Sequence, residues 1–336
     1  MELIILDENS SFSEWANKWY LHKSIGISAG YKISIASQMK HLTNYFGDIP
    51  ICKIKPMHIY DLIEQLAIKN PNTNKPSSKQ FLKDIKSVAT NIFDYVCDNT
   101  DYERNPARRI NIPKNAPKNI RRSLTDEEIS WVISMQHRAR IAALIMMFCG
   151  LRAGELVPLQ WLDIDFENSK LYINKSVVKT SGNVYSVKHG TKNGKNRIIA
   201  IPNNLLKELL EYKKSSKSRF ICPKADDTMH TPSSWKRLWE SFNNALSHHY
   251  ATLQQSQQSI YNPKGIKKRV DKITPHMFRH TYATLLYTSE VDVLSASKLL
   301  GHSDVSVTLK VYTHLQESSY NVSIIKFDEF IKHFFQ

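Results

Sequence analysis

Cysteine is scarce in this chain of 336 residues. The four cysteines, Cys52, Cys97, Cys149 and Cys222, stand far apart, and none of them forms a CxxC pair. A disulfide framework needs many cysteines in a short secreted chain, and a zinc ribbon needs closely spaced pairs. The sequence therefore excludes both, and we expect reduced thiols in a cytoplasmic protein.

Long apolar runs are also missing. The longest, "IAALIMMFCGL" at residues 141–151, is too short to span a bilayer. The first residues, "MELIILDENSS", lack the basic leader and the long apolar core of a secretory signal. We find no internal repeat and no low-complexity tract beyond a mild bias toward Lys, Asn and Ser. The sequence therefore predicts no membrane-spanning helix and no secretory signal.

Acidic residues are few compared with basic ones. The chain has 31 Asp and Glu against 46 Lys and Arg, which gives a net charge of +15, and 41% of its residues are apolar. Such an excess in a globular chain indicates a polyanionic partner. Nucleic acid is the first candidate and an anionic membrane surface the alternative. The length is sufficient for two domains with a core in each.

A basic segment divides the chain. Residues 104–122, "RNPARRINIPKNAPKNIRR", hold seven basic residues, three prolines and no acidic residue. Prolines break helices and favour an extended backbone. We therefore predict a linker that crosses a phosphate backbone, with an ordinary solvated linker as the alternative. The residues expected to contact DNA are Arg104, Arg108, Arg109, Lys114, Lys118, Arg121 and Arg122.

The residues before this linker have a helical pattern. Apolar residues recur at spacings of three and four in residues 11–25, 30–46, 57–69 and 78–98. Ser77 and Gln80 fit a capping box at the start of the last helix. Residues 1–103 are therefore predicted to form a small all-helical domain without a catalytic pattern of its own.

The residues after the linker mix helices with a few strands. Thr125 and Glu128 fit a second capping box, and a buried helix follows at residues 139–150. Runs rich in Val, Ile and Tyr at residues 170–178, 184–188 and 196–202 predict one small antiparallel sheet. The remainder is predicted to be mainly helical. Residues 123–312 would form this mainly α domain, and residues 313–336 a C-terminal tail.

Two basic residues stand at the ends of predicted elements. In "CGLRAGELV", Arg152 follows the buried helix, and Glu155 comes three residues later. An arginine that leaves a core helix needs an anion, because a buried unpaired guanidinium is costly. That anion is either Glu155 alone or a phosphate. In the second case Glu155 orients the guanidinium group of Arg152 toward the phosphate. Lys192 lies at the mouth of a hairpin predicted from Asn193-Gly194, where a solvated lysine is the alternative.

Three more basic residues share a helix face near the end of the chain. His276, Arg279 and His280 are three and four residues apart in a helix that begins after Pro275. An anion at the helix N-terminus would relieve their mutual repulsion. A metal is a poor alternative, because Arg279 would lie beside the cation and no carboxylate or cysteine is suitably spaced.

A tyrosine follows a glycine-histidine pair in "LLGHSDVSVTLKVYTH". Tyr312 stands ten residues after His302. The simplest interpretation is that this tyrosine packs in a core. The alternative is that both side chains address one phosphate.

Taken together, these motifs resemble the tyrosine recombinases, the phage-integrase family. The matching stretches are "GLRAGEL", "TKNGKNR", "HMFRH" and "LGHSDVSVTLKVYTH", in family order, and the chain looks most like integrases of phages and conjugative transposons. The resemblance implies a mainly α protein, in which a helical core-type DNA-binding domain precedes a mixed α/β catalytic domain. The separate arm-site-binding domain that many such integrases carry is expected to be absent from this sequence or to have been removed. The catalytic residues that the resemblance implies are Arg152, Lys192, His276, Arg279, His302 and Tyr312, with Glu155 and His280 in support.

The resemblance also implies the chemistry. Tyr312 would attack phosphorus and form a 3′-phosphotyrosyl bond, His276 would take its proton, and Lys192 would protonate the leaving 5′-oxygen. Arg152, Arg279 and His302 would stabilise the charge on the phosphate. Because the ester conserves bond energy and no acidic cluster is placed for magnesium, we expect neither metal nor ATP, and no other cofactor.

The expected activity is site-specific recombination that integrates or excises a mobile element. A chromosome-dimer resolvase of the same family is the alternative, and a type IB topoisomerase or a non-catalytic DNA-binding regulator fits less well. The expected partner is double-stranded DNA in the cytoplasm, at the nucleoid. The protein would bind it as a dimer on one site and a tetramer in synapsis, with an accessory DNA-bending or directionality factor as a further candidate.

The tail carries an apolar stripe, formed by Ile324, Phe327, Ile331, Phe334 and Phe335. It either packs on its own domain or, as the resemblance implies, docks on a neighbouring protomer.

Overall fold

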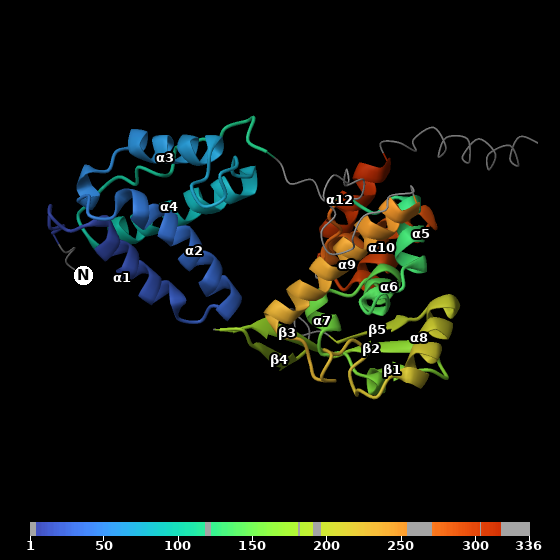
Figure 1. The fold of residues 1–336 in the computed structure, drawn as a ribbon. Helices are drawn as coiled ribbons and strands as arrows, with labels where there is room; N and C mark the ends of the chain where they lie inside the picture. The colour runs from blue at the N-terminus through green and yellow to red at the C-terminus, as the bar shows by residue number, and fades with distance from the viewer. Residues whose placement is uncertain are drawn as a thin grey trace, which may run out of the picture. The chain divides into compact units, whose positions relative to one another are not determined.

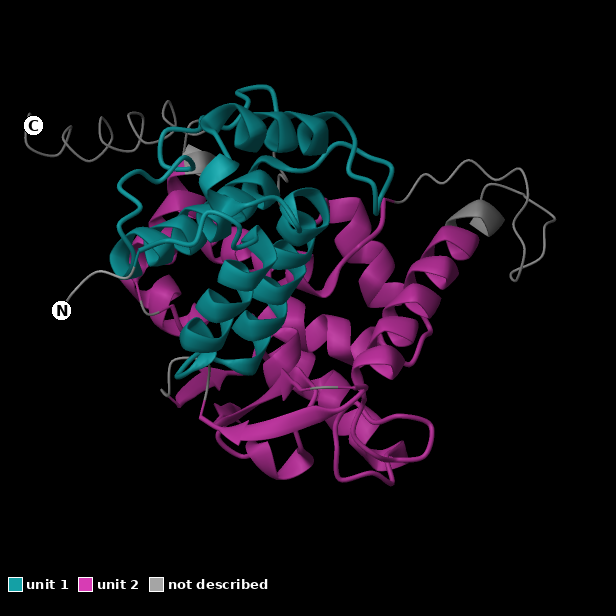
Figure 2. Cartoon of the chain, turned by 90° about the vertical axis from the view of Figure 1, so that its left-hand side faces the viewer, with its two compact units in different colours: residues 1–120 teal, residues 121–336 magenta. Residues whose placement is uncertain are grey.

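The chain forms two compact units, residues 1–120 and 121–336, which Figure 2 shows in two colours. The computed structural model describes residues 5–117, 122–180, 182–190, 196–253, 271–302 and 304–316. Each unit has its own hydrophobic core. Figure 1 labels most of the helices and strands.

The first unit is all-helical over its described residues. Ser11 and Glu14 form a capping box that starts the first helix. Phe12, on the first turn, packs its ring 5.4 Å from Phe46 and 5.9 Å from Phe93, which brings three helices together. This result confirms the helical prediction. The elements are α1 (Phe12–Ser24), α2 (Ala29–Phe46), the 3-10 helix η1 (Ile51–Lys53), α3 (Pro56–Ile68) and α4 (Lys79–Asn99).

Helix α4 is held by the apolar stripe that its sequence predicts. Ile85, Val88, Ile92 and Val96 are all buried, and each such side chain contributes about 1.5–3 kcal/mol on burial. The predicted N-cap was one residue too early. Ser78 caps the helix by accepting a hydrogen bond from the backbone N–H of Phe81.

The segment predicted as a linker packs, over residues 104–117, against the first unit. Ala107, Ile110 and Ala116 are buried in its core. The carbonyl of Pro117 accepts a hydrogen bond of 2.7 Å from the backbone N–H of Lys79, at the start of α4. The segment is non-helical and contains turns at residues 106–109 and 114–115, and its small apolar residues attach it to the helices.

The second unit is mainly helical with a few short strands. Its helices are α5 (Asp126–Ser134), α6 (Arg140–Cys149), α7 (Ala153–Leu156), the 3-10 helix η2 (Trp161–Asp163), α8 (Asn203–Ser215), α9 (Pro232–Leu253), α10 (Pro275–Thr288), α11 (Val293–Leu300) and α12 (Val305–Gln316). Its strands are β1 (Ile164–Asp165), β2 (Lys170–Ile173), β3 (Lys175–Lys179), β4 (Tyr185–His189) and β5 (Arg197–Ala200).

Helix α6 is the centre of this unit, because nearly all of its side chains are buried. Helix α10 packs along it. The helix ends at Gly150, whose φ of +64° lies in the left-handed region. A Cβ at this position would overlap the ring of Tyr282 on α10, so only glycine allows the chain to turn here while α10 stays close.

The strands form two small antiparallel sheets where one was predicted. One sheet has the order β1-β2-β5 and the other contains β3 and β4. Leu171 pairs with Ile199 in the first, and Val177 with Val187 in the second. Strands β4 and β5, before and after Asn193-Gly194, thus belong to different sheets and do not pair with each other over their described residues. Asn193 and Gly194 themselves lie outside the described residues.

None of the helices in the described ranges is long and apolar enough to cross a membrane. Within the same ranges, no group of three or more His, Cys, Asp or Glu side chains is placed to hold a metal ion.

Candidate active site

Arg279 is the most buried of the predicted basic site residues that the structure describes. It lies on α10, is 4% exposed, and donates from its two terminal nitrogens to the carbonyls of Gly150 and Leu300. These carbonyls are at the C-terminal ends of α6 and α11, where helices leave acceptors unpaired. Burial, and then the charge of Arg152, lower the pKa of Arg279 to about 9.

Arg152 lies at the start of α7, two residues after Gly150. Its backbone N–H and its guanidinium both donate to Glu155, at 2.9 and 3.0 Å, and a second guanidinium nitrogen lies 3.5 Å from the carbonyl of Gly301. The pair with Glu155, which the sequence left as an alternative, is therefore present. The Arg152 side chain is still 32% exposed, whereas Glu155 is 2% exposed.

His302 follows directly on the end of α11. Gly301 ends that helix with a φ of +63°, and this turn brings His302 toward the carbonyls that hold the arginines. Its Nδ1 lies 2.7 Å from the hydroxyl of Thr308 on α12, and Thr308 is fully buried. Burial, and then the charges of Arg279, Arg152 and Arg197, lower the pKa of His302 to about 4. The imidazole is therefore neutral at pH 7.

Tyr312 lies on α12 and is buried. Its hydroxyl donates a hydrogen bond of 3.1 Å to the carbonyl of Val291, between α10 and α11. The ring of Tyr287 contacts its ring edge-on at 5.0 Å. Burial, and then the negative charge of Asp292, raise the pKa of the Tyr312 hydroxyl. The core packing that the sequence left open is thus observed, on the helix that begins three residues after His302.

Of the remaining predicted residues of the cluster, two lie on α10. His276 is exposed on the first turn of α10, and His280 is half-buried one turn later. Lys192 lies outside the described residues, and so do Lys118, Arg121 and the predicted tail from residue 317 onward.

The basic residues of the predicted linker, residues 104–122, fall into two groups. Arg104, Arg108 and Arg109 are exposed and line a hollow of about 720 Å³ in the first unit. Lys55, Glu103 and several neutral residues complete its lining. Arg108 also forms an ion pair of 2.9 Å with Asp94. Lys114 is exposed as well.

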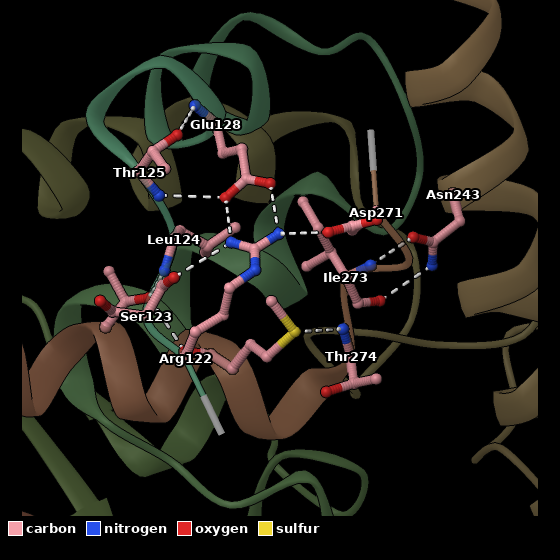
Figure 3. A network of polar contacts seen from close by, with 11 residues as sticks. Arg122, Ser123, Leu124, Thr125, Glu128, Asn243, Asp271, Ile273 and Thr274 are labelled. Carbon is pink, nitrogen blue, oxygen red and sulfur yellow. Dashed lines mark hydrogen bonds and ion pairs between the residues drawn. The ribbon is translucent and has the colours of Figure 1, made fainter. Parts of the chain in front are cut away.

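Arg122 is placed differently (Figure 3). Its guanidinium makes two hydrogen bonds, of 2.6 and 2.7 Å, to the carboxylate of Glu128, and lies 3.8 Å from Asp271. Glu128 also accepts from the backbone N–H of Thr125, which confirms the predicted capping box. Arg122 thus stabilises the start of α5 through Glu128. A DNA contact by this residue stays a prediction.

One residue of the cluster was missed. Arg197, the first residue of β5, makes two hydrogen bonds to Glu155, at 2.9 and 2.7 Å. The quoted motif "TKNGKNR" ends with it, but a single arginine at the start of a strand gives no signal of a buried partner in a distant segment.

Comparison with known proteins identifies the family of this chain. Residues 122–319 match the model of the phage integrase family, and residues 11–67 match that of the N-terminal SAM-like domain of phage integrases. A XerC-like tyrosine recombinase of Caldanaerobacter subterraneus subsp. tengcongensis is 27% identical, over 82% of this chain and 72% of the relative. The ICEBs1 integrase of Bacillus subtilis is 26% identical, over 87% of this chain and 75% of the relative.

Solved structures show the same fold. The Tn1549 transposon integrase in complex with a circular intermediate DNA superposes with a TM-score of 0.74 at 17% identity, over 94% of this chain and 99% of that one. A lambda integrase in a tetramer bound to a Holliday junction gives a TM-score of 0.61 at 20% identity, over 89% and 79%. The fold class expected from the sequence is thereby confirmed, and so is the resemblance. The chain belongs to the phage integrase family of tyrosine recombinases, enzymes that cleave and rejoin DNA.

Proposed function

We propose that this recombinase breaks DNA strands at specific sites by forming a 3′-phosphotyrosyl bond with Tyr312. The observation that supports the proposal most directly is the convergence of Arg152, Arg279 and His302 on the backbone at residues 300–301. The guanidinium groups come from the start of α7 and from α10, and the neutral imidazole comes from the turn after α11. Such a set of donors suits an anionic phosphate whose charge grows during nucleophilic attack.

In this mechanism the guanidinium groups bind the oxygens of the scissile phosphate. Arg152 is partly exposed and keeps N–H groups beyond those used by Glu155, so it would bind a non-bridging oxygen. Arg279 is held by two carbonyls, which fixes its plane. His302 would accept from the Thr308 hydroxyl at Nδ1 and donate its Nε2–H to the phosphate, because a neutral imidazole has one donor and one acceptor.

The bond changes balance without a further reactant. The Tyr312 oxygen bonds to phosphorus, the bond from phosphorus to the 5′-oxygen breaks, and the 3′-phosphate stays on the tyrosine. His276 would accept the tyrosine proton, and Lys192 would supply a proton to the 5′-oxygen. At an ordinary pKa of about 10, only about one tyrosine in 10³ is ionised at pH 7. Prior ionisation would cost about 4 kcal/mol, and transfer of the proton during attack avoids part of that cost.

Tyr312 must leave its present hydrogen bond before it attacks. The bond to the Val291 carbonyl stabilises the buried position by about 1 kcal/mol, and the raised pKa disfavours ionisation there. Release of the hydroxyl from Val291 is therefore part of the proposed reaction path.

The hollow lined by Lys55, Arg104, Arg108 and Arg109 is the proposed contact with the DNA backbone in the first unit. Its positive charge and the net charge of +15 favour binding through release of counterions. We further propose a dimer on one site and a tetramer in synapsis, by analogy with the DNA-bound lambda integrase dimer and tetramer, and action on DNA in the cytoplasm.

The substrate that we propose is the joined or free ends of a mobile element. This part of the proposal is supported by the likeness to the ICEBs1 and Tn1549 integrases. A chromosome-dimer resolvase is the second candidate, supported by the similarity to XerC-like and XerA recombinases.

The proposal is tested by mapping the covalent complex. The protein is mixed with nicked DNA fragments that lose the 5′-hydroxyl strand after cleavage, so that the adduct accumulates. Mass spectrometry of digested adducts should identify Tyr312 as the modified residue, and sequencing of DNA recovered from cells should show whether element ends or a chromosomal site is cut. DNA attached to a different tyrosine would contradict the proposal.

Thr308 provides a separate prediction. Thr308→Val keeps the shape of the side chain but removes the hydroxyl that selects the tautomer of His302. We expect the single-turnover cleavage rate to fall about tenfold, equivalent to about 1.4 kcal/mol, because one directed hydrogen bond in the site is lost. Thr308→Ser should retain most of the rate. A loss in Thr308→Ser together with a normal rate in Thr308→Val would assign the effect to packing of the methyl group instead.

A further inference from the structure

Arg197 is joined to the catalytic cluster through Glu155. Its two terminal nitrogens donate to the two carboxylate oxygens, in the planar geometry that gives a guanidinium-carboxylate pair its strength. The side chain is 10% exposed, and its Nε is buried with no hydrogen-bond partner among the described residues. Arg197 is therefore a fixed part of the site interior.

The packing around Arg197 leaves it little freedom. A Cβ at Gly301 would lie 2.8 Å from Cδ and 3.0 Å from Nε of Arg197, so the glycine allows the arginine to pass beside the turn before His302. The carbonyl of the same Gly301 faces Arg152. Arg197 thus lies between Glu155 and the turn that carries His302.

Glu155 holds two arginines at once. Burial by itself would raise the pKa of this carboxyl, but the hydrogen bonds and charge of Arg197, with those of Arg152, lower it to about 2. The charged groups that face it are Arg152 from the start of α7, Arg197 from β5 and Arg279 from α10. Strand β3, which also packs on α7, presents the backbone carbonyl of Val177 to Gly154.

We propose that Arg197 is a positioning residue for DNA cleavage, which holds Glu155 by both oxygens so that Glu155 in turn fixes Arg152 toward the scissile phosphate. Arg197 acts through Glu155 and does not contact the DNA. Without it, Glu155 has one strong partner in place of two, and its carboxylate is free to rotate and draw Arg152 inward. The inference rests on the proposed function, because it concerns the same phosphate site.

The first test is Arg197→Gln, measured by single-turnover cleavage of nicked DNA. We expect the rate to fall about 100-fold, the loss typical of a misplaced reacting group, while the affinity for intact DNA is unchanged. In addition, the variant should lose rate as pH falls from about 8 to 5.5, because burial then raises the pKa of Glu155 and protonation releases Arg152. The rate ratio of variant to unaltered protein corrects for other titrating groups.

A matched control is available in the same unit. Arg140 makes an equivalent pair of hydrogen bonds, 2.7 and 3.0 Å long, to Glu208. Arg140→Gln removes a two-pronged ion pair from a place outside the cluster. It should lower the thermal stability by less than Arg197→Gln does, because Glu208 is 43% exposed, and it should leave the cleavage rate and the pH profile unchanged.

A double variant distinguishes action through Glu155 from direct contact. If Arg197 acts through Glu155, Arg197→Gln combined with Glu155→Gln should cleave no more slowly than Glu155→Gln alone, because the two residues belong to one interaction. Arg197→Lys, which restores the charge but only one hydrogen bond, should recover part of the rate and flatten the pH profile.

Two results would overturn the inference. One is an Arg197→Gln protein that cleaves like the unaltered protein at every pH. The other is a double variant whose losses multiply, which would mean that Arg197 contacts the DNA itself. Failure of the proposed function would look different, because the unaltered protein would then form no adduct on Tyr312.

Discussion

Tyr312→Phe is expected to bind its DNA with unchanged affinity and to form no covalent protein–DNA adduct. Phenylalanine keeps the ring that packs against Tyr287 but lacks the oxygen that bonds to phosphorus. The lost hydrogen bond to the Val291 carbonyl should reduce the free energy of unfolding by only about 1 kcal/mol. The loss of cleavage is therefore chemical rather than structural, and a denaturing gel with labelled nicked DNA measures it directly.

Tyr172→Phe is the control for this experiment. Tyr172 lies on β2 of the same unit and is partly exposed, so its variant should form the adduct at the normal rate. An adduct that persists in Tyr312→Phe would identify another nucleophile, with Tyr320 as the first residue to examine. It would also remove the reason for the spacing between His302 and Tyr312.

Local structure was predicted well because its causes are local. The apolar stripe of α4 and the capping box of Thr125 and Glu128 lie within a few residues of the bonds they make. Strand pairing was predicted less well, because β2 pairs with β5 across the intervening β3 and β4. Asn193-Gly194 indicates a tight turn, but it contains no information on which strand lies next to which.

The residues of the candidate site were likewise predicted where they are close in sequence and missed where they are distant. The motifs around Arg152 and His302 were identified in the sequence, because these residues occur in compact stretches. Arg197 was missed, since its partner Glu155 is 42 residues away. The positions of the arginines also depend on backbone carbonyls, such as the Gly150 carbonyl 129 residues before Arg279. A carbonyl is present at every residue, so no sequence pattern distinguishes one that accepts from an arginine.

The carbonyls that hold Arg279 lead to the second large prediction. Arg279→Lys keeps a positive charge but replaces a planar fork by a single ammonium, which cannot reach both Gly150 and Leu300 as the guanidinium does. The stability should fall by about 1–3 kcal/mol, because one buried carbonyl loses its donor. The single-turnover cleavage rate should fall about 10³-fold, the effect of removing a donor aimed at a developing negative charge.

The residual activity of Arg279→Lys should also depend on pH in a defined direction. Burial and the charge of Arg152 already lower the pKa of the arginine to about 9, and the same surroundings would lower that of a lysine from its ordinary value of about 10.4 toward neutrality. The protonated form is the active one, so the rate relative to the unaltered protein should be highest at low pH and decline as pH rises. Arg140→Lys, at the ion pair with Glu208, should show neither the loss nor the slope. The contrary result is a rate for Arg279→Lys within about threefold of that of the unaltered protein, with the same pH profile. It would mean that a point charge is sufficient at this position and that the two carbonyl contacts stabilise only the fold.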